Sequence, residues 1–237
     1  MEPTTGRIDA GRVVGQAFST YREHAGPLLG GAVIVIGIAG VIGGLLSATD
    51  SVGLILLGSV VGLVAQFLYT GYVVKLVQDV RDGRRDHTVG ELFRAAAPFI
   101  GTLVLNGIIA GIAIGIGLFL LVVPGLILIT IWAVISPAIV VENRGAIEAF
   151  GRSRELVRGD GWAVFAAIVL AFLIVFAVSF VFGIIGAAIG DDAGQVIVGA
   201  IGNILVAPVA ALVASILFFD LGGGTPPAAE PTAEPAL

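Results

Sequence analysis

The strongest constraint on how this chain folds is a run without any charged side chain, from residue 98 to residue 141. As one helix, at about 1.5 Å per residue, the run would extend roughly 66 Å, about twice the hydrocarbon core of a bilayer. It must therefore turn once. Pro124-Gly125, in the sequence VVPGL, predicts the place, because proline lacks a backbone donor and glycine permits a bend. Two membrane spans follow from this run.

Four further apolar runs are long enough to span a membrane, which takes about 20 apolar residues. The chain is 57% hydrophobic and only 12% charged, which is well below the charged fraction of an ordinary soluble domain. It has no Cys, and this excludes disulfides, thiolate metal sites and a cysteine nucleophile. We predict an all-α polytopic membrane protein with a single domain over residues 1–221. The six predicted spans are 27–46, 53–77, 98–121, 125–141, 162–189 and 195–219.

The basic residues lie on one side of these spans. All twelve Lys and Arg residues fall before the first span, from the last residues of the second span to the start of the third, or between the fourth and fifth. The other connections carry only aspartates or no charge. By the positive-inside rule the basic face is cytoplasmic, so both termini are predicted to be cytoplasmic. Only one of the twelve is Lys, and together with many Ala and Gly this suggests a prokaryotic plasma membrane.

Three short segments share an amphipathic pattern: VGQAFSTY (14–21), VGELFRAA (89–96) and AIEAFGRS (146–153). Apolar residues recur at offsets 0, 3 and 4, which is one face of an α-helix. Each segment precedes a pair of spans. The chain therefore reads as three units of interfacial helix, span, outer turn and returning span. The predicted units are 8–80, 88–141 and 144–221, a possible threefold internal repeat.

The stretch between the fourth and fifth spans, residues 140–160, carries four Arg and four acidic residues. We interpret it as a helix lying in the membrane interface, with its Arg side chains toward water and lipid phosphates. Its charges could serve topology alone, contact anionic lipid headgroups, or dock a protein partner. Glu148 and Arg152 are spaced for an ion pair, and Thr88 and Glu91, before the third span, fit a capping box. The apolar stripe comprises Ala146, Ala149, Phe150, Leu156 and Val157.

The segment VVPGLILITIWAVISPAIVVENRGAIEAFGRSRELVRGDGW resembles the membrane domain of some glycerophosphoryl diester phosphodiesterases and its stand-alone uncharacterised relatives. The shared features are a Pro-Gly pair, a Pro ahead of an acidic residue, and A-x-x-R-S-x-x-L-x-x-G before an aromatic residue. The resemblance implies a six-span domain and no activity, because the phosphodiesterase chemistry of fused members belongs to a separate soluble barrel. The matching positions are Pro124, Gly125, Pro137, Glu142, Ala149, Arg152, Ser153, Leu156, Gly159 and Trp162.

Polar side chains inside the predicted spans are few, and none in a central region is ionisable. Asn106 and Asn203 could line a cavity, although such side chains more commonly hydrogen-bond between helices. His24 and His87 lie in different polar segments without metal-ligand spacing. We therefore predict no catalytic residue, metal site or cofactor. The Pro-, Ala- and Glu-rich residues 222–237 predict a disordered tail.

Glycines recur every four residues along the third span, at Gly107, Gly111 and Gly115. Small residues at this spacing let helix backbones approach closely. We predict that this face packs within the chain in the first instance, and that it serves oligomerisation as the alternative.

The sequence favours a non-enzymatic accessory or organising module in membrane lipid or envelope physiology. Expected partners are membrane lipids, including anionic headgroups at the cytoplasmic face, and either a protein partner or a second copy. No nucleic acid is expected. The alternative is a small transporter or channel subunit, which should show a polar cluster near the bilayer midplane or interrupted helices pointing at one site. An enzyme ranks third.

Overall fold

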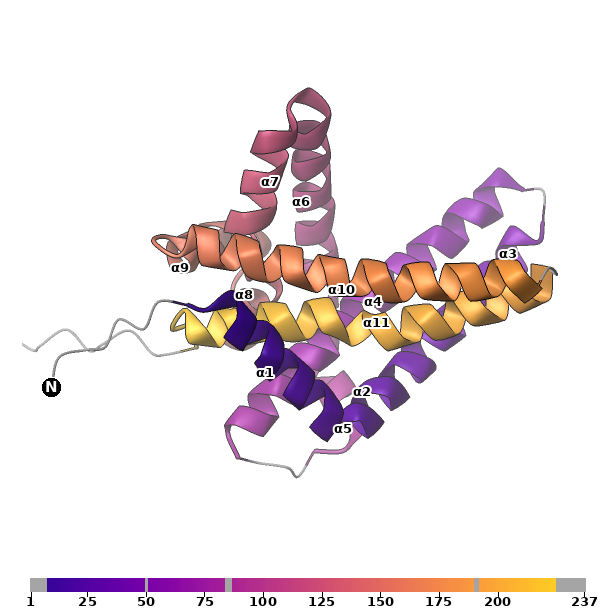
Figure 1. The fold of residues 1–237 in the computed structure, drawn as a ribbon, viewed down its shortest axis with the longest axis horizontal. Coiled ribbons are helices and arrows are strands. Elements are labelled where there is room, and N and C mark those ends of the chain that lie inside the picture. The colour runs from indigo at the N-terminus through magenta and orange to yellow at the C-terminus, as the bar shows by residue number, and fades with distance from the viewer. Residues whose placement is uncertain (1–7, 50, 84–86, 190–191, 225–237) are drawn as a thin grey trace, which may run out of the picture.

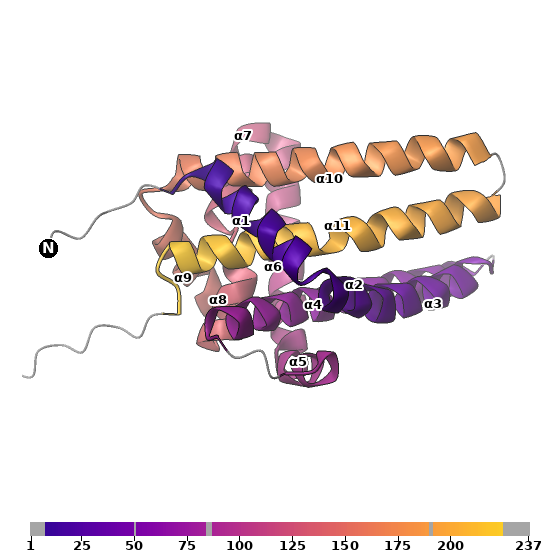
Figure 2. The ribbon, with the colours of Figure 1, turned by 60° about the horizontal axis from the view of Figure 1, so that its bottom comes forward.

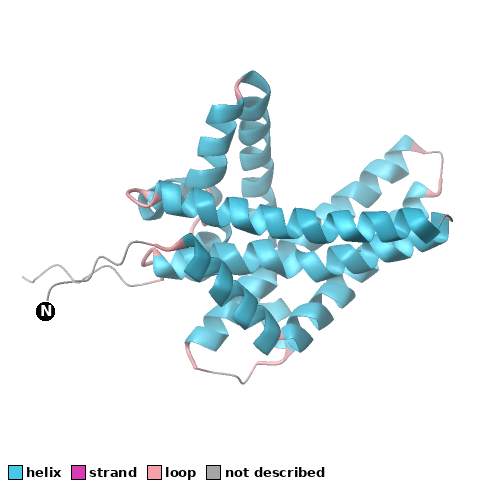
Figure 3. Cartoon of the chain, viewed as in Figure 1, coloured by secondary structure: helices cyan, strands magenta, loops and turns pink. Residues whose placement is uncertain are grey.

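The computed structural model describes residues 8–49, 51–83, 87–189 and 192–224. Every regular element in these ranges is helical, and they contain no strand (Figure 3). Six helical stretches are long and apolar enough to cross a membrane, which confirms the predicted all-α architecture. Residues 225–237, most of the predicted tail, lie outside the described ranges. The six stretches are Ala25–Ser47, Val52–Arg81, Val89–Leu120, Val122–Glu142, Gly161–Ile189 and Gly194–Asp220.

These stretches form three helical hairpins, each described here by its elements. The first joins α2 (Ala25–Ala32), a π-helical turn η1 (Val33–Gly37) and α3 (Ile38–Ser47) to the returning α4 (Val52–Arg81). The second joins a 3₁₀ turn η2 (Ala97–Phe99) and α6 (Ile100–Leu120) to α7 (Val122–Ile131) and α8 (Ile135–Glu142). The third is formed by α10 (Gly161–Ile189) and α11 (Asp192–Asp220).

The charge-free run turns at Leu121, so the predicted position at Pro124-Gly125 was wrong by about one helical turn. Leu121 is extended, with φ −155° and ψ 124°, and α7 begins at the next residue. Pro124 is tolerated in the first turn of α7, where backbone N–H groups have no intrahelical partner. Gly125 lies where α7 passes α6: a Cβ there would be 2.7 Å from the backbone nitrogen of Leu118. Pro124 thus fits the first turn of α7, and Gly125 allows α7 to approach α6 closely.

A second interruption separates α7 from α8 at residues 132–134, just ahead of Pro137. Trp132 and Val134 leave helical geometry, with ψ of 13° and 21°. The Ile135 N–H then donates to the Trp132 carbonyl, three residues back, instead of four. Pro137 supplies the sequence signal for this break, because proline has no N–H to donate to the Ala133 carbonyl four residues back, and its ring crowds that carbonyl.

Three short amphipathic helices precede the hairpins: α1 (Ala10–Glu23), α5 (Val89–Ala96) and α9 (Ala146–Val157). The capping box predicted before α5 is confirmed. The Thr88 N–H donates to the Glu91 carboxylate at 2.7 Å, and the Glu91 N–H donates to the Thr88 hydroxyl at 3.4 Å.

Each amphipathic helix packs on the hairpin of the preceding unit. α5 packs on α4, α9 packs mainly on α8, and α1 packs on α10 and α11 at the other end of the chain. The docking is therefore cyclic, because the helix of the first unit lies on the hairpin of the third. A chain built of three equivalent units would show this cyclic order of contacts. The internal repeat itself stays a prediction.

The hairpins converge at the ends that carry the amphipathic helices and separate toward their tips. α10 and α11 lie side by side, while the α6–α7 hairpin stands across them in both views (Figures 1 and 2). The largest fully buried side chains lie near the convergence, among them Tyr69, Tyr72 and Phe218. The hydroxyls of Tyr69 and Tyr72 donate to the carbonyls of Leu28 and Pro27, at 2.9 and 2.7 Å. Two clusters of buried apolar side chains hold the hairpins together, and much of the remaining apolar surface is exposed.

Candidate functional site

Most of the residues that carry the resemblance lie around the interruption between α7 and α8, whereas Pro124 and Gly125 lie at the start of α7. Ser153, on α9, is fully buried beneath the interruption. Its hydroxyl donates to the Ile131 carbonyl at 2.9 Å and accepts the Val134 N–H at 3.3 Å. In an unbroken helix those two groups would find partners on the same helix, but here their ladder is interrupted. Ser153 therefore replaces the missing backbone partners and fixes α9 against the break.

A charge cluster lies at the end of α8. Arg152 holds the Glu142 carboxylate with two parallel bonds, Nε to Oε2 at 2.8 Å and Nη2 to Oε1 at 2.9 Å. This fork geometry is among the stronger ionic hydrogen bonds in proteins. The bond to Glu142 raises the pKa of the Arg152 guanidinium, which keeps it charged. Arg144 approaches the same carboxylate at 3.3 Å, and the Gly224 N–H donates to it at 3.1 Å.

The predicted pairing of Glu148 with Arg152 is wrong. Glu148 instead accepts the Gly145 N–H at 3.3 Å and so caps the start of α9. Arg152 pairs with Glu142, ten residues away, and with Glu155 at 3.5 Å. Local spacing allowed the i,i+4 pair, but the turn between α8 and α9 brings a better-oriented carboxylate to the same guanidinium.

The other motif positions shape this joint. Pro137 and Ala149 are buried where α8 meets α9, and Leu156 is half-buried against the same core. Gly159 has φ 105°, a conformation that L side chains rarely adopt, and it lets the chain pass from α9 into α10. Trp162, one turn later, is 84% exposed. These residues therefore shape the contact between α8 and α9 and the turn into α10, whereas the side chain of Trp162 is exposed.

The two asparagines do not form a common site. Asn106, on α6, is buried, and its amide donates to the Ala146 carbonyl of α9 at 2.7 Å. Asn203, on α11, is exposed. Asn106 thus links the second hairpin to α9 through an interhelical hydrogen bond, which is the more common role of such a residue.

The glycine stripe on α6 is divided. A Cβ at Gly107 would lie 1.9 Å from the ring of Phe67, so this position needs glycine for α6 to pass α4. Gly111 and Gly115 have open space where a Cβ would be. The prediction of packing within the chain therefore fails at these two positions, because the hairpin tips separate there.

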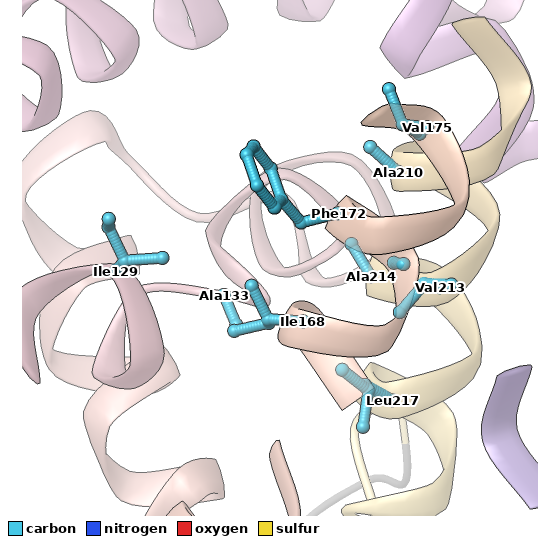
Figure 4. Close-up of a pocket in the computed structure, with 10 residues that line it drawn as sticks. Ile129, Ala133, Ile168, Phe172, Val175, Ala210, Val213, Ala214 and Leu217 are labelled. Atoms are coloured by element: carbon cyan, nitrogen blue, oxygen red, sulfur yellow. The ribbon is translucent and has the colours of Figure 1, made fainter. Parts of the chain in front are cut away.

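Two apolar grooves lie beside α7. One groove, of about 340 Å³, lies between α7, α10 and α11 and is lined by apolar side chains (Figure 4). Phe172 and Ile168 of α10 border it, with Ile129 of α7 on the facing side (Figure 4). The second groove, of about 470 Å³, lies between α7 and the beginning of α10 and reaches Trp162.

An ion pair that sequence reasoning did not assign joins the two ends of the fold. Asp220, at the end of α11, lies 3.2 Å from Arg12 of α1 and 3.7 Å from Arg81 of α4. The Arg81 guanidinium also lies 4.7 Å from the ring centre of Phe219. The sequence signal was present: FFDL places an acidic residue at the end of the last span, on the face that carries the arginines.

Two arginines of the 140–160 stretch remain for other contacts. Arg144 and Arg152 are held by Glu142, whereas Arg154 and Arg158 are exposed and form no ion pair within 4 Å in the described parts of the chain. Among the described residues, no three His, Asp or Glu side chains lie together as a metal site would require.

Six membrane-length helices in three hairpins, joined by amphipathic helices, define a polytopic helical membrane protein. Residues 52–212 match the uncharacterised protein family UPF0259, and the chain belongs to this family. Over 114 residues it is 36% identical to a UPF0259 membrane protein of Pectobacterium carotovorum subsp. carotovorum (strain PC1). That alignment covers 48% of this chain and 45% of the relative, so the chain spans about half of the relative's length. No solved structure matches the chain.

Proposed function

We propose that this protein is a non-enzymatic membrane module that organises lipids around its diverging hairpins, as an accessory to lipid or envelope physiology. We place it in a prokaryotic plasma membrane with both termini in the cytoplasm. The one-sided distribution of Lys and Arg supports that orientation.

The observation that carries the proposal is the pair of apolar grooves beside α7. Hairpins that served only to anchor a chain would gain stability by packing together, yet here α6–α7 stands away from α10–α11 and leaves both grooves open. In a bilayer the default occupant of an open apolar groove is an acyl chain, because lipid tails are as apolar as the side chains around them.

The hydrogen bonds of two buried polar side chains, Asn106 and Ser153, indicate that these residues have a structural role. Asn106 and Ser153 spend their hydrogen-bonding capacity on the backbone of neighbouring helices. They are therefore not available to bind a solute without loosening the joint at α9. The resemblance to the membrane domain of glycerophosphoryl diester phosphodiesterases agrees with a lipid-related accessory role, since that domain accompanies an enzyme and does not supply its chemistry.

A small transporter or channel subunit is the second candidate. The interruption between α7 and α8 favours it, since broken helices line the binding sites of many transporters. In this chain, however, the Ser153 hydroxyl occupies the backbone groups that the break exposes.

Native mass spectrometry after mild detergent extraction tests the proposal. We expect phospholipid to remain bound after activation that strips lipid from an unrelated six-span protein of similar size. Equal lipid loss from both proteins would overturn the proposal. Lipid loss together with solute uptake in proteoliposomes would establish the transporter reading in its place.

A further inference from the structure

We propose that the groove between α7 and the beginning of α10 binds one anionic phospholipid, with an acyl chain along α7 and the phosphate at Arg154 and Arg158. This site deepens the proposed function and rests on it, because it assigns one lipid class to one place.

The groove has the size and lining of a ligand site. Its volume of about 470 Å³ falls within the roughly 300–1,000 Å³ typical of small-molecule sites. Val123, Ile127 and Ile131 line it along one face of α7, at successive intervals of four residues. Phe165 of α10 borders it on the facing side. A linear apolar trough of this kind fits an extended hydrocarbon chain.

One end of the groove lies at the turn that follows Arg158, and the lining is apolar apart from Thr130. Gly159 and Gly161, in the turn between α9 and α10, form that end, and Arg158 directly precedes them. Arg154 lies one helical turn before Arg158, and both side chains are exposed. An apolar trough with cationic residues at one end is complementary to an amphiphile that carries a phosphate.

Within the described parts of the chain, no acidic side chain near this rim forms an ion pair with Arg154 or Arg158. Glu155 lies 3.5 Å from Arg152, and Glu148 caps the N–H of Gly145. Asp160 lies in the turn between Gly159 and Gly161, and its carbonyl accepts the Val164 N–H in the first turn of α10. Glu142 is held by Arg152 and Arg144. Arg144 and Arg152 are thus already paired with Glu142, whereas Arg154 and Arg158 can bind a phosphate.

Trp162 marks the level of the headgroups. It lines the groove, is 84% exposed, and meets the ring of Phe165 edge-on, with centroids 6.1 Å apart. Exposed Trp side chains are enriched where the hydrocarbon core meets the headgroup layer. The indole therefore lies where a bound lipid would pass from its tail to its phosphate, and it can report on that lipid.

Fluorescence quenching by brominated lipids tests the site. The chain has two Trp residues, so Trp132→Phe leaves Trp162 as the single reporter. The variant is reconstituted into vesicles of phosphatidylcholine that contain increasing fractions of dibrominated phosphatidylglycerol or dibrominated phosphatidylcholine. An arginine near a lipid phosphate is worth about fivefold in association. We expect the relative association constant at Trp162 to favour the anionic lipid by at least about fivefold.

Two sets of variants locate the effect. Arg154→Gln with Arg158→Gln should bring the preference at Trp162 close to one, while Arg22→Gln, which is exposed on α1, should leave it unchanged. The Trp162→Phe variant moves the reporter to Trp132, which is half-buried against Phe150, and should show no comparable preference.

Equal quenching by the two lipids in the parent variant would overturn the site, since Trp162 would then see only ordinary surrounding lipid. Absence of quenching by either lipid would also overturn it, because a protein segment would then cover the groove. In both cases the native mass spectrometry result would still decide the proposed function. Phosphate buffer at 10 mM, about the concentration used in many buffers, should not remove the preference if the acyl chain contributes to binding.

Discussion

Replacing Ser153 by alanine removes the side chain that completes the hydrogen bonding at the α7–α8 break. The variant leaves the Ile131 carbonyl and the Val134 N–H without the partner they have now, in a region where Ser153 itself has no exposed surface. A buried group left unsatisfied costs about 1–3 kcal/mol. Hydrogen bonds between membrane helices average about 0.6 kcal/mol, because the unfolded chain in the membrane also finds partners. With two groups affected, we expect a loss of about 1–3 kcal/mol in the free energy of unfolding.

Ser215→Ala is the matched control. Ser215 is equally buried, and its hydroxyl donates to the Ala211 carbonyl four residues back in the same helix. That carbonyl lies in the interior of α11, where it keeps its backbone donor when the hydroxyl is removed. The control variant therefore loses a hydroxyl without leaving a backbone group unpaired, and its cost should be a few tenths of a kcal/mol.

Unfolding by a denaturing detergent, followed by circular dichroism and by Trp132 fluorescence in a Trp162→Phe background, measures both variants. Trp132 is suited to this purpose because it lies at the break and packs edge-on against Phe150, at 4.7 Å between centroids. Free energies of unfolding that agree within error for Ser153→Ala and Ser215→Ala would refute the reasoning. The break would then be held by packing, and the hydroxyl would be incidental.

Three further outcomes are expected. Asn106→Leu should lower the free energy of unfolding by about 0.6–1.7 kcal/mol, while Asn203→Leu, at an exposed position, should be close to neutral in detergent. Gly107→Leu should cost about 1–3 kcal/mol by overpacking, and Gly111→Leu much less; equal thermal stability of these two would contradict the division of the glycine stripe. A Cys at Ser51 should react with an impermeant reagent on intact cells, whereas a C-terminal tag should need permeabilisation, and the reverse would contradict the orientation.

Sequence reasoning was strong where the signal is local. Apolar runs located all six spans, and the Thr88–Glu91 capping box held because all its atoms belong to four consecutive residues. The amphipathic pattern also located α1, α5 and α9, because a period of 3.6 residues is visible within two turns.

Reasoning failed where the partner is distant in sequence. Pro137 accounts for a break between α7 and α8, but the group that stabilises the break is a hydroxyl about 20 residues later, on another helix. Arg152 likewise has a plausible partner four residues away in Glu148, but the fold supplies Glu142. The Ser153 and Arg152 positions were selected from the family pattern, yet their roles became clear only when α8 and α9 were placed together.

The docking of α1 on α10 and α11 has a consequence for biosynthesis. α1 leaves the ribosome before α10 and α11, and the surface it covers is completed about 200 residues later, a delay on the order of 10–40 s at about 5–20 residues per second. Until then its buried face, with Val13 and Ala17, has no protein to cover it. An amphipathic helix in that position can rest on the membrane surface. The same bilayer that later surrounds the hairpins would thus act as a temporary partner for α1, and the arrival of Asp220 beside Arg12 would mark the end of assembly.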